Sequence, residues 1–162
     1  MNEETRPEPE FSVFDPQRFL GLDEMGLRVL SWRRLGRPDG PGLRQIRCEP
    51  DSHDARWCPS CGAYARVRSS WLRTLAHVPY GDDAVHLLVR VRRYECVPCS
   101  RSWSDDPEAV GAGRGVLSVP AVMWALRRVC LDSMTVSACA RLLHVAWACL
   151  LYTSDAADDL TR

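Results

Sequence analysis

Hydrophobic and polar residues alternate along two stretches in the middle of the chain. Between residues 85 and 92, four apolar residues at odd positions alternate with a largely basic set at even positions. A period of two places the two sets on opposite faces of a strand, so we expect one buried face and one basic face. A similar alternation puts Arg66 and Arg68 opposite Val67 and Trp71. Both stretches predict β-strands.

Two earlier apolar runs predict a β-hairpin. Leu27 to Leu35 and Leu43 to Cys48 contain Val, Leu, Ile and Trp, and the residues between them are mainly Gly, Pro and Asp. Strands joined by such a turn-forming segment commonly pair with each other.

Apolar spacing changes to the helical pattern near residue 120. Pro120 suits the first turn of a helix, and apolar residues then recur on one face. They are Val122, Leu126, Val129 and Cys130. We therefore expect this face to be buried, with Cys48 and Cys139 as further core cysteines.

A second helix is expected to begin after Thr135, which suits the N-cap position. Its apolar residues at helical spacing are Val136, Cys139, Ala140 and Leu143. His144 then lies in a tight turn where glycine is common, and Trp147 would open a third helix. This layout predicts a helix-turn-helix, whose third helix enters the major groove of DNA. A generic helical hairpin is the alternative.

These patterns divide the chain into five segments. We expect a disordered acidic leader over residues 1–18, a β-rich unit over 19–104, a linker over 105–117, a partial helix-turn-helix over 118–148 and a non-native tail over 149–162. The tail reads as the translation of a transposon-end sequencing adapter and is set aside for fold reasoning. A genuine acidic tail is the alternative.

Length and charge narrow the function classes. A chain of 162 residues holds one ordinary domain or two small ones, without room for a nuclease core as well. The net charge is zero, yet residues 25–148 contain eighteen arginines against eleven acidic residues, as expected for a partner that is a polyanion. The acidic N-terminus is unlike a secretory signal, and the chain contains no apolar run of membrane-spanning length. We therefore expect a cytoplasmic location and no membrane partner.

Two C-x-x-C pairs carry the clearest chemistry. Cys58 and Cys61 form the first pair, Cys96 and Cys99 the second, and 34 residues separate them. Two residues between thiolates let both sulfurs reach one ion, and Gly62 provides the freedom that such a turn often needs. Four thiolates make a closed tetrahedral shell, so the expected cofactor is structural zinc.

Redox chemistry, disulfides and histidine ligands are alternative uses of these residues. A single C-x-x-C can be a redox dithiol, but two pairs argue against this, and a cytosolic setting disfavours disulfides. His53 and His77 could each replace a cysteine, although four sulfurs already fill a tetrahedral site. The fold class is therefore α+β, a small β-rich zinc-ribbon domain preceded by a β-hairpin and followed by a truncated helix-turn-helix.

Taken in order, these motifs resemble the amino-terminal region of the ISL-three group of insertion-sequence transposases. The corresponding segments are Trp57 to Gly62, Arg73 to Gly81, Val89 to Tyr94, Cys96 to Cys99, and Val122 to Trp147. The sequence departs from the group at Ser100, His144 and Ala146. The resemblance implies recognition of terminal inverted repeats, while strand cleavage at an Asp/Asp/Glu metal site would belong to a domain outside this chain.

The principal hypothesis is DNA binding by a transposase fragment that is not itself an enzyme and that could form a homo-oligomer in the full-length protein. The arginines expected to contact phosphates are Arg66, Arg68, Arg90, Arg92 and Arg93. Any of them can also serve only for solubility. The alternatives are a stand-alone zinc-ribbon transcription regulator, a protein-interaction module and a dithiol redox enzyme.

Overall fold

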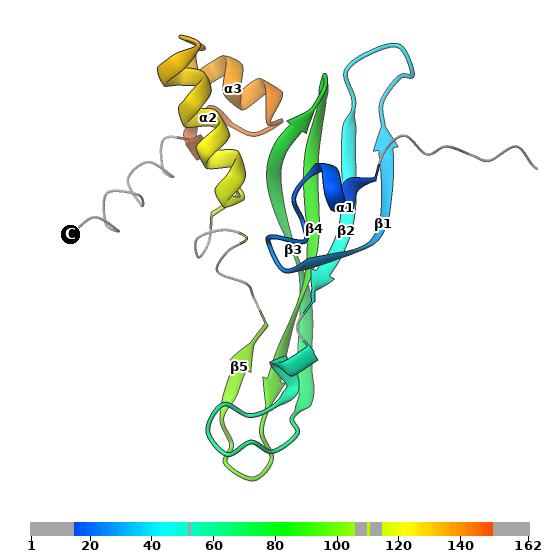
Figure 1. Ribbon diagram of the computed structural model, residues 1–162, viewed down its shortest axis with the longest axis vertical. Coiled ribbons are helices and arrows are strands. Elements are labelled where there is room, and N and C mark those ends of the chain that lie inside the picture. The colour runs from blue at the N-terminus through cyan, green and yellow to red at the C-terminus, as the bar shows by residue number, and fades with distance from the viewer. Residues whose placement is uncertain (1–14, 52, 106–109, 111–114, 151–162) are drawn as a thin grey trace, which may run out of the picture.

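A twisted five-stranded sheet organises the computed structural model, which describes residues 15–51, 53–105, 110 and 115–150 (Figure 1). In chain order the elements are α1 (Pro16–Phe19), β1 (Leu27–Leu35), β2 (Leu43–Pro50), the 3-10 turn η1 (His53–Arg56), β3 (Arg66–Tyr80), β4 (Asp83–Glu95), β5 (Ser102–Ser104), α2 (Val119–Leu131) and α3 (Val136–Leu142). Residues 147–150 are again helical. None of the helices in the described part of the chain is long and apolar enough to cross a membrane.

The strand order is β1-β2-β4-β3. β1 pairs with β2 and β3 with β4 in antiparallel fashion, whereas β2 and β4 run parallel. The β2–β4 pairing ends at Cys48 and Val89, and β5 takes over the same edge of β4 from Arg93 onward. This parallel contact joins the β1–β2 hairpin to the β3–β4 hairpin, and the sequence pattern did not predict it.

The main core lies on one face of the sheet. The odd-numbered residues 85 to 91 of β4 are all fully buried, which confirms the predicted apolar face. Ile46 and Cys48 extend this core on β2, and Leu20, Leu22 and Met25 from α1 and the turn that follows it cover it. Burying an aliphatic side chain of this size contributes about 1.5 to 3 kcal/mol.

The N-terminal helix α1 overlaps the segment expected to be a disordered leader. Asp15 caps the helix by accepting a hydrogen bond from the backbone of Gln17. The Gln17 side chain then donates to the Leu27 carbonyl at 2.7 Å and accepts from the Val29 amide at 2.8 Å, which fastens α1 to β1. The expectation of disorder was wrong for residues 15–18, and residues 1–14 lie outside the described residues.

Helices α2 and α3 pack at the β3 edge of the sheet. The Ala76 amide donates to the Val116 carbonyl at 2.8 Å, and the Ser118 amide donates to the Ala76 carbonyl at 2.9 Å. His77 is buried beside them, with its ring nitrogens 2.7 Å from the Ser118 hydroxyl and 3.0 Å from the Leu20 carbonyl. The C-terminal end of the expected linker, residues 105–117, is therefore hydrogen-bonded to the sheet.

The buried side of α2 differs from the expected one. Ala121 and Ala125 are buried, whereas Leu126, Val129 and Cys130 are exposed. The small alanines allow the helix to lie close to the strand edge, and the larger side chains then point away. Cys48 and Cys139 are buried as predicted, and the expectation for Cys130 was wrong.

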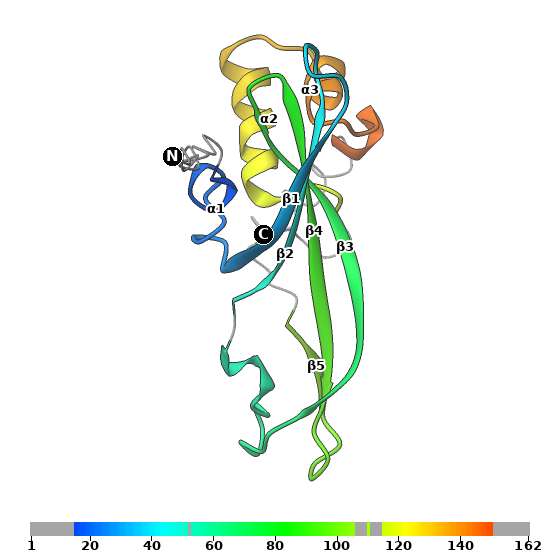
Figure 2. The same ribbon diagram turned by 90° about the vertical axis from the view of Figure 1, so that its right-hand side faces the viewer.

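The helical segment wraps around the sheet edge. Figure 2 shows α1 and α3 on opposite sides of the sheet. Ser118 and Thr135 cap α2 and α3 by accepting hydrogen bonds from Ala121 and Ala138. After α3, His144 adopts a φ of 55°, the left-handed conformation that glycine usually supplies.

Candidate metal centre

The β3–β4 hairpin places both cysteine pairs at one end of the molecule. Its register sets Arg66 opposite Glu95, so the first pair, which precedes β3, lies beside the second pair, which follows β4. The 34-residue spacer runs out along β3 and back along β4. The 15 residues of β3 span roughly 50 Å at about 3.3 Å per residue. The cysteine turns and the β3–β4 turn therefore lie at opposite ends of the hairpin (Figure 1).

Each cysteine pair sits in a tight turn of the same kind. In the first turn, the Gly62 amide donates to the Cys58 carbonyl and the Cys58 amide to the Ala63 carbonyl, both at 2.9 Å. In the second, the Cys96 amide donates to the Arg101 carbonyl at 2.8 Å. These backbone bonds direct the four sulfurs to a common point.

The sulfur positions match a tetrahedral zinc shell. The Cys58–Cys99 and Cys61–Cys96 sulfur pairs are 3.5 and 3.4 Å apart, and Cys61 and Cys99 are 3.7 Å apart. All four sulfurs lie within 4.8 Å of one another. Zn–S bonds of about 2.3 Å require sulfur separations of about 3.8 Å in a tetrahedron. Four protein thiolates leave no position for water, so the ion has a structural role.

The environment of the sulfurs favours the thiolate form of Cys58. Burial opposes ionisation of Cys58, but hydrogen bonds from the backbone of Ser60 and Cys61 outweigh it and lower its pKa to about 6. At Cys96 a backbone hydrogen bond from Cys99 favours the thiolate, yet burial and the neighbouring sulfurs raise its pKa to about 12. A divalent cation removes this conflict, because it stabilises all four thiolates together.

Among the described residues, these four cysteines are the one group of three or more potential ligands whose donor atoms converge. His77 forms its two hydrogen bonds far from the cysteines along the hairpin, so it is not a ligand. Zinc is therefore held by the four cysteines that the spacing predicted.

The five arginines expected to contact DNA are not gathered on one surface. Arg66 and Arg68 form ion pairs with Glu95, and Arg92 pairs with Glu49 and Asp105 with its side chain only 22% exposed. Arg90 and Arg93 are both exposed, but their positions on β4 differ by an odd number, so they point to opposite faces.

Glu95 and Glu49 are held as carboxylates by these contacts. The hydrogen bond from Arg66 holds the pKa of Glu95 below its usual value. Burial raises the pKa of Glu49, but Arg92 and Arg28 more than compensate and lower it overall. The charge of Arg92 is therefore neutralised by ion pairs within the protein.

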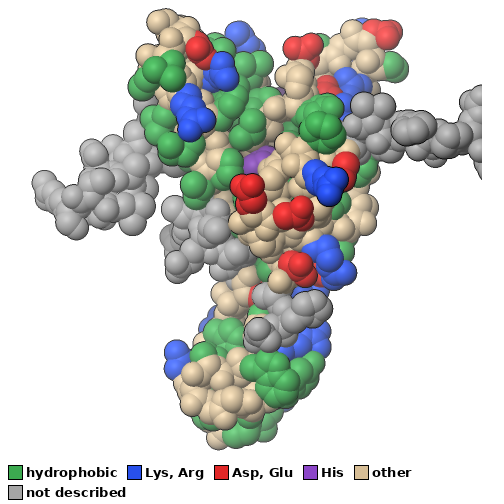
Figure 3. Space-filling view, viewed as in Figure 1, with side chains coloured by type: hydrophobic (Ala, Val, Ile, Leu, Met, Phe, Trp, Pro, Cys, Tyr) green, Lys and Arg blue, Asp and Glu red, His purple; other side chains and the backbone are tan. Residues whose placement is uncertain are grey.

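Arg47 is an exposed arginine that the sequence analysis did not single out. It lies between the buried residues Ile46 and Cys48 on β2, so its side chain points away from the core. The alternation of apolar and polar residues along β2 could have identified Arg47 from the sequence. Figure 3 shows the other side of the sheet, where α1 lies and where acidic and basic side chains are intermixed.

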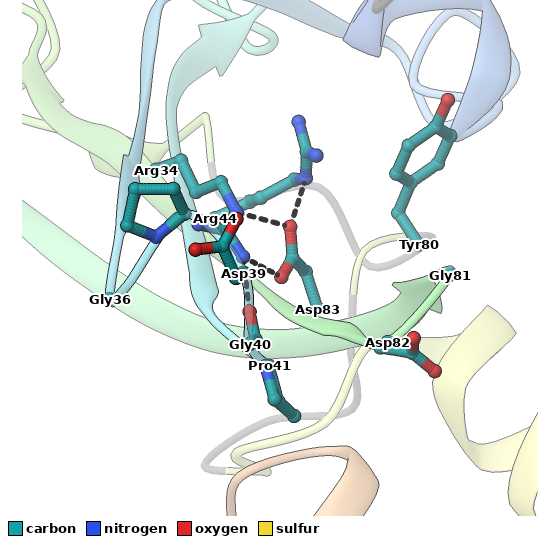
Figure 4. A pocket seen from close by; sticks show the side chains of 11 residues that line it. Arg34, Gly36, Asp39, Gly40, Pro41, Arg44, Tyr80, Gly81, Asp82 and Asp83 are labelled. Carbon is teal, nitrogen blue, oxygen red and sulfur yellow. Dashed lines mark hydrogen bonds and ion pairs between the residues drawn. The ribbon is translucent and has the colours of Figure 1, made fainter.

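A second polar centre, a cleft of about 730 Å³, lies at the end of the sheet opposite the cysteines (Figure 4). Asp83 accepts hydrogen bonds there from Arg34 and Arg44. The cleft lies between the β1–β2 loop and the β3–β4 turn, and the contacts of Asp83 connect these two segments. Its two arginines share one carboxylate, so we assign it a structural role.

Comparison with known proteins gives one match. Residues 54–99 match the family model described as the zinc-finger of transposase IS204/IS1001/IS1096/IS1165. No curated protein and no solved structure matches the chain significantly. The family match spans both cysteine pairs and the hairpin between them. The four-sulfur geometry makes this part of the chain a structural zinc site, and its sequence is similar to the zinc finger of these transposases.

Proposed function

We propose that this chain is the DNA-binding amino-terminal portion of an insertion-sequence transposase and that it recognises the terminal inverted repeats of its element. The observation that carries the proposal is the match of residues 54–99 to a transposase zinc finger. The basic excess over residues 25–148 supports it, because a polyanionic partner requires such a charge.

The helical segment supports the same proposal. Two capped helices, α2 and α3, are followed by a turn at His144 in the left-handed conformation and by renewed helix at residues 147–150. Trp147, at the start of that helix, is 59% exposed. In a helix-turn-helix, the residues at this position begin the helix that reads the major groove.

Strand cleavage is not part of the proposed activity of these residues. We propose that the acidic residues needed for cleavage belong to another part of the transposase. Magnesium-dependent nicking of a supercoiled plasmid by the purified chain would contradict this part of the proposal.

A protein-interaction module is the second candidate, and one observation favours it. Met123, Leu126, Val129 and Leu131 of α2 are exposed large apolar side chains, and Figure 3 shows hydrophobic side chains beside basic ones over this helix. Such patches often mark protein interfaces.

Titration of the zinc-loaded chain against duplex DNA tests the proposed function. One duplex carries the element's terminal repeat and the other a shuffled sequence of equal composition. We expect the logarithm of the affinity to fall with the logarithm of the salt concentration by about 0.9 per phosphate contacted. At fixed salt, recognition of the repeat would appear as tighter binding of that duplex, and we expect a small but measurable preference because phosphate contacts carry most of the affinity. Equal affinity for the two duplexes would reject recognition of the repeat and leave DNA binding without sequence preference.

A Cys58→Ser variant is the control for the zinc finger, because it removes one of the four ligands. We expect it to lose most of the binding. Failure of the zinc-loaded protein to bind either duplex at low salt would reject the DNA-binding function in favour of the interaction module.

A further inference from the structure

The sheet face opposite the main core carries unpaired arginines. Arg47 lies beside Leu88 in the parallel register of β2 and β4, and Arg90 is two residues further along β4 on the same face. Both side chains are exposed, and neither forms an ion pair with any described residue. Glu49 also points to this face, but Arg28 and Arg92 occupy its carboxylate. The positive charges of Arg47 and Arg90 are therefore available to an anionic partner.

The surface between the two arginines is shallow and apolar. Leu30, Leu72 and Leu88 line a depression of about 170 Å³ together with Arg47 and Arg90. Leu30 and Leu72 are about half exposed, at 47% and 50%. An apolar floor between two cations fits a backbone in which phosphates alternate with deoxyribose rings, since the rings can rest on the leucines.

The helical segment reaches the same face. The Nε2 atom of His86 lies 3.2 Å from the Leu143 carbonyl at the end of α3, and its ring lies 5.8 Å from that of His144. His86 has the same parity on β4 as Arg90, so it points to the same side, which is also the side of α3 in Figure 2. The turn before residue 147 thus lies at one end of the arginine face.

The spacing between these two contacts suits duplex DNA. Four residues of β4 separate His86 from Arg90, or about 13 Å along the strand. The major groove of B-DNA is about 12 Å wide. A helix that enters the groove beside His144 would therefore bring Arg90 and Arg47 to the phosphates at the groove's edge.

We propose that the sheet face formed by Leu30, Arg47, Leu72, Leu88 and Arg90 binds the phosphate backbone of the same duplex that the helical segment contacts. This inference rests on the proposed DNA-binding function and names the surface that performs it. A second copy of the chain is a less suitable occupant. A two-fold interface would bring Arg47 and Arg90 against the same arginines of the partner, and like charges would repel.

The test compares arginines that lie on opposite sides of the sheet. Arg47→Ala, Arg90→Ala and the double variant remove charges from the proposed surface. Arg18→Ala removes one exposed charge from α1, which lies on the opposite side of the sheet (Figure 2), and it serves as the matched control. Affinity for a 30-base-pair duplex is measured by fluorescence anisotropy at several salt concentrations. Zinc content and melting temperature show whether each variant remains folded.

We expect each single substitution on the proposed surface to weaken binding by about fivefold to tenfold near 0.1 M salt. Each should also lower the salt slope by about 0.9, and the double variant by about twice as much, because each arginine neutralises one phosphate. Arg18→Ala should remain within about twofold of the wild type.

The outcomes distinguish an error in the proposed binding surface from an error in the proposed DNA-binding function. If the wild type binds DNA and Arg18→Ala impairs it as much as Arg90→Ala, the surface is wrong and the DNA-binding function stands. If the wild type binds no duplex, the function fails, and the proposed surface fails with it. Leu72→Glu provides a further arm, because it should weaken DNA binding. A change in oligomeric state with unchanged DNA affinity would instead identify a self-association surface and overturn the inference.

Discussion

Gly62 and Ser100 occupy the same position in the two cysteine turns. Each follows the second cysteine of its pair, and their φ angles are 68° and 57°. Both residues are therefore in the left-handed region, where a Cβ atom meets the following carbonyl oxygen and costs about 1 to 2 kcal/mol. The first turn avoids this cost with glycine, whereas the second turn bears it.

Replacing Ser100 with glycine should stabilise the zinc finger. We expect Ser100→Gly to raise the free energy of unfolding of the zinc-loaded protein by about 0.5 to 1 kcal/mol, since part of the relieved strain is offset by the larger entropy of unfolded glycine. Gly62→Ser should lower it by a similar amount. Urea unfolding followed by circular dichroism measures both. Equal stability of the two variants would show that the turns are not under this strain.

Removal of zinc should unfold the tip of the β3–β4 hairpin. Structural zinc contributes on the order of 10 to 16 kcal/mol of apparent binding free energy in small zinc modules. We expect about one zinc per chain, and Cys58→Ser should lose both the metal and the ordered tip. Cys130→Ser is the matched control, because Cys130 is exposed on α2 and lies outside the one cluster of potential ligands among the described residues. Elemental analysis and hydrogen exchange of residues 57–66 and 95–101 report the result. Unchanged protection after chelation would contradict the structural role of the ion.

Asp83 should be a stabilising residue at the opposite end of the sheet. Its carboxylate accepts four hydrogen bonds of 2.8 to 2.9 Å from Arg34, Arg44 and the Gly42 amide, as Figure 4 shows for the two arginines. Hydrogen bonding by Arg34 is the main cause that holds its pKa below the usual value. Asp83→Asn removes the charge that both arginines share, and we expect a loss of about 2 to 3 kcal/mol.

Asp82→Asn is the control for this substitution, because Asp82 is the neighbouring exposed carboxylate. It should change the free energy of unfolding by less than about 0.5 kcal/mol. Denaturant titration at pH 7 measures both variants. If Asp83→Asn proves as mild as Asp82→Asn, the hairpin and the β3–β4 turn are held together by other contacts.

His77 should make the stability of the chain depend on pH. Burial lowers its pKa below the ordinary value of 6.5, and the Leu20 carbonyl only partly opposes this shift. Because the unfolded chain binds the proton more readily, the contribution of His77 is complete above pH 6.5 and declines as the pH falls below it. His77→Gln removes the titration. The free energy of unfolding of the His77→Gln variant should therefore vary less between pH 8 and 5.5 than that of the wild type. The zinc content of both proteins is measured at each pH. Parallel curves for the two proteins would exclude His77 as the source.

Local sequence patterns were sufficient to predict the zinc site and the main buried strand. The two C-x-x-C pairs and their spacing define a four-sulfur ligand set, because the short spacing alone brings two sulfurs to one ion. The alternation over residues 85–91 likewise defines a buried face, since successive side chains of a strand point to opposite sides.

Contacts between distant segments required the tertiary structure. The parallel pairing of β2 with β4 depends on the fit between two strands, and neither strand's pattern specifies its neighbour. Arg92 looks like a free basic residue in the sequence, yet the pairing of β2 with β4 brings Glu49 to it. Arg90 forms no ion pair with the residues that the structure describes. The buried side of α2 was decided in the same way, because the narrow space at the β3 edge accepts Ala121 and Ala125 and turns Leu126 and Val129 outward. A sequence pattern records the polarity of each position, whereas the partner of a side chain is set by the strand or helix that packs against it.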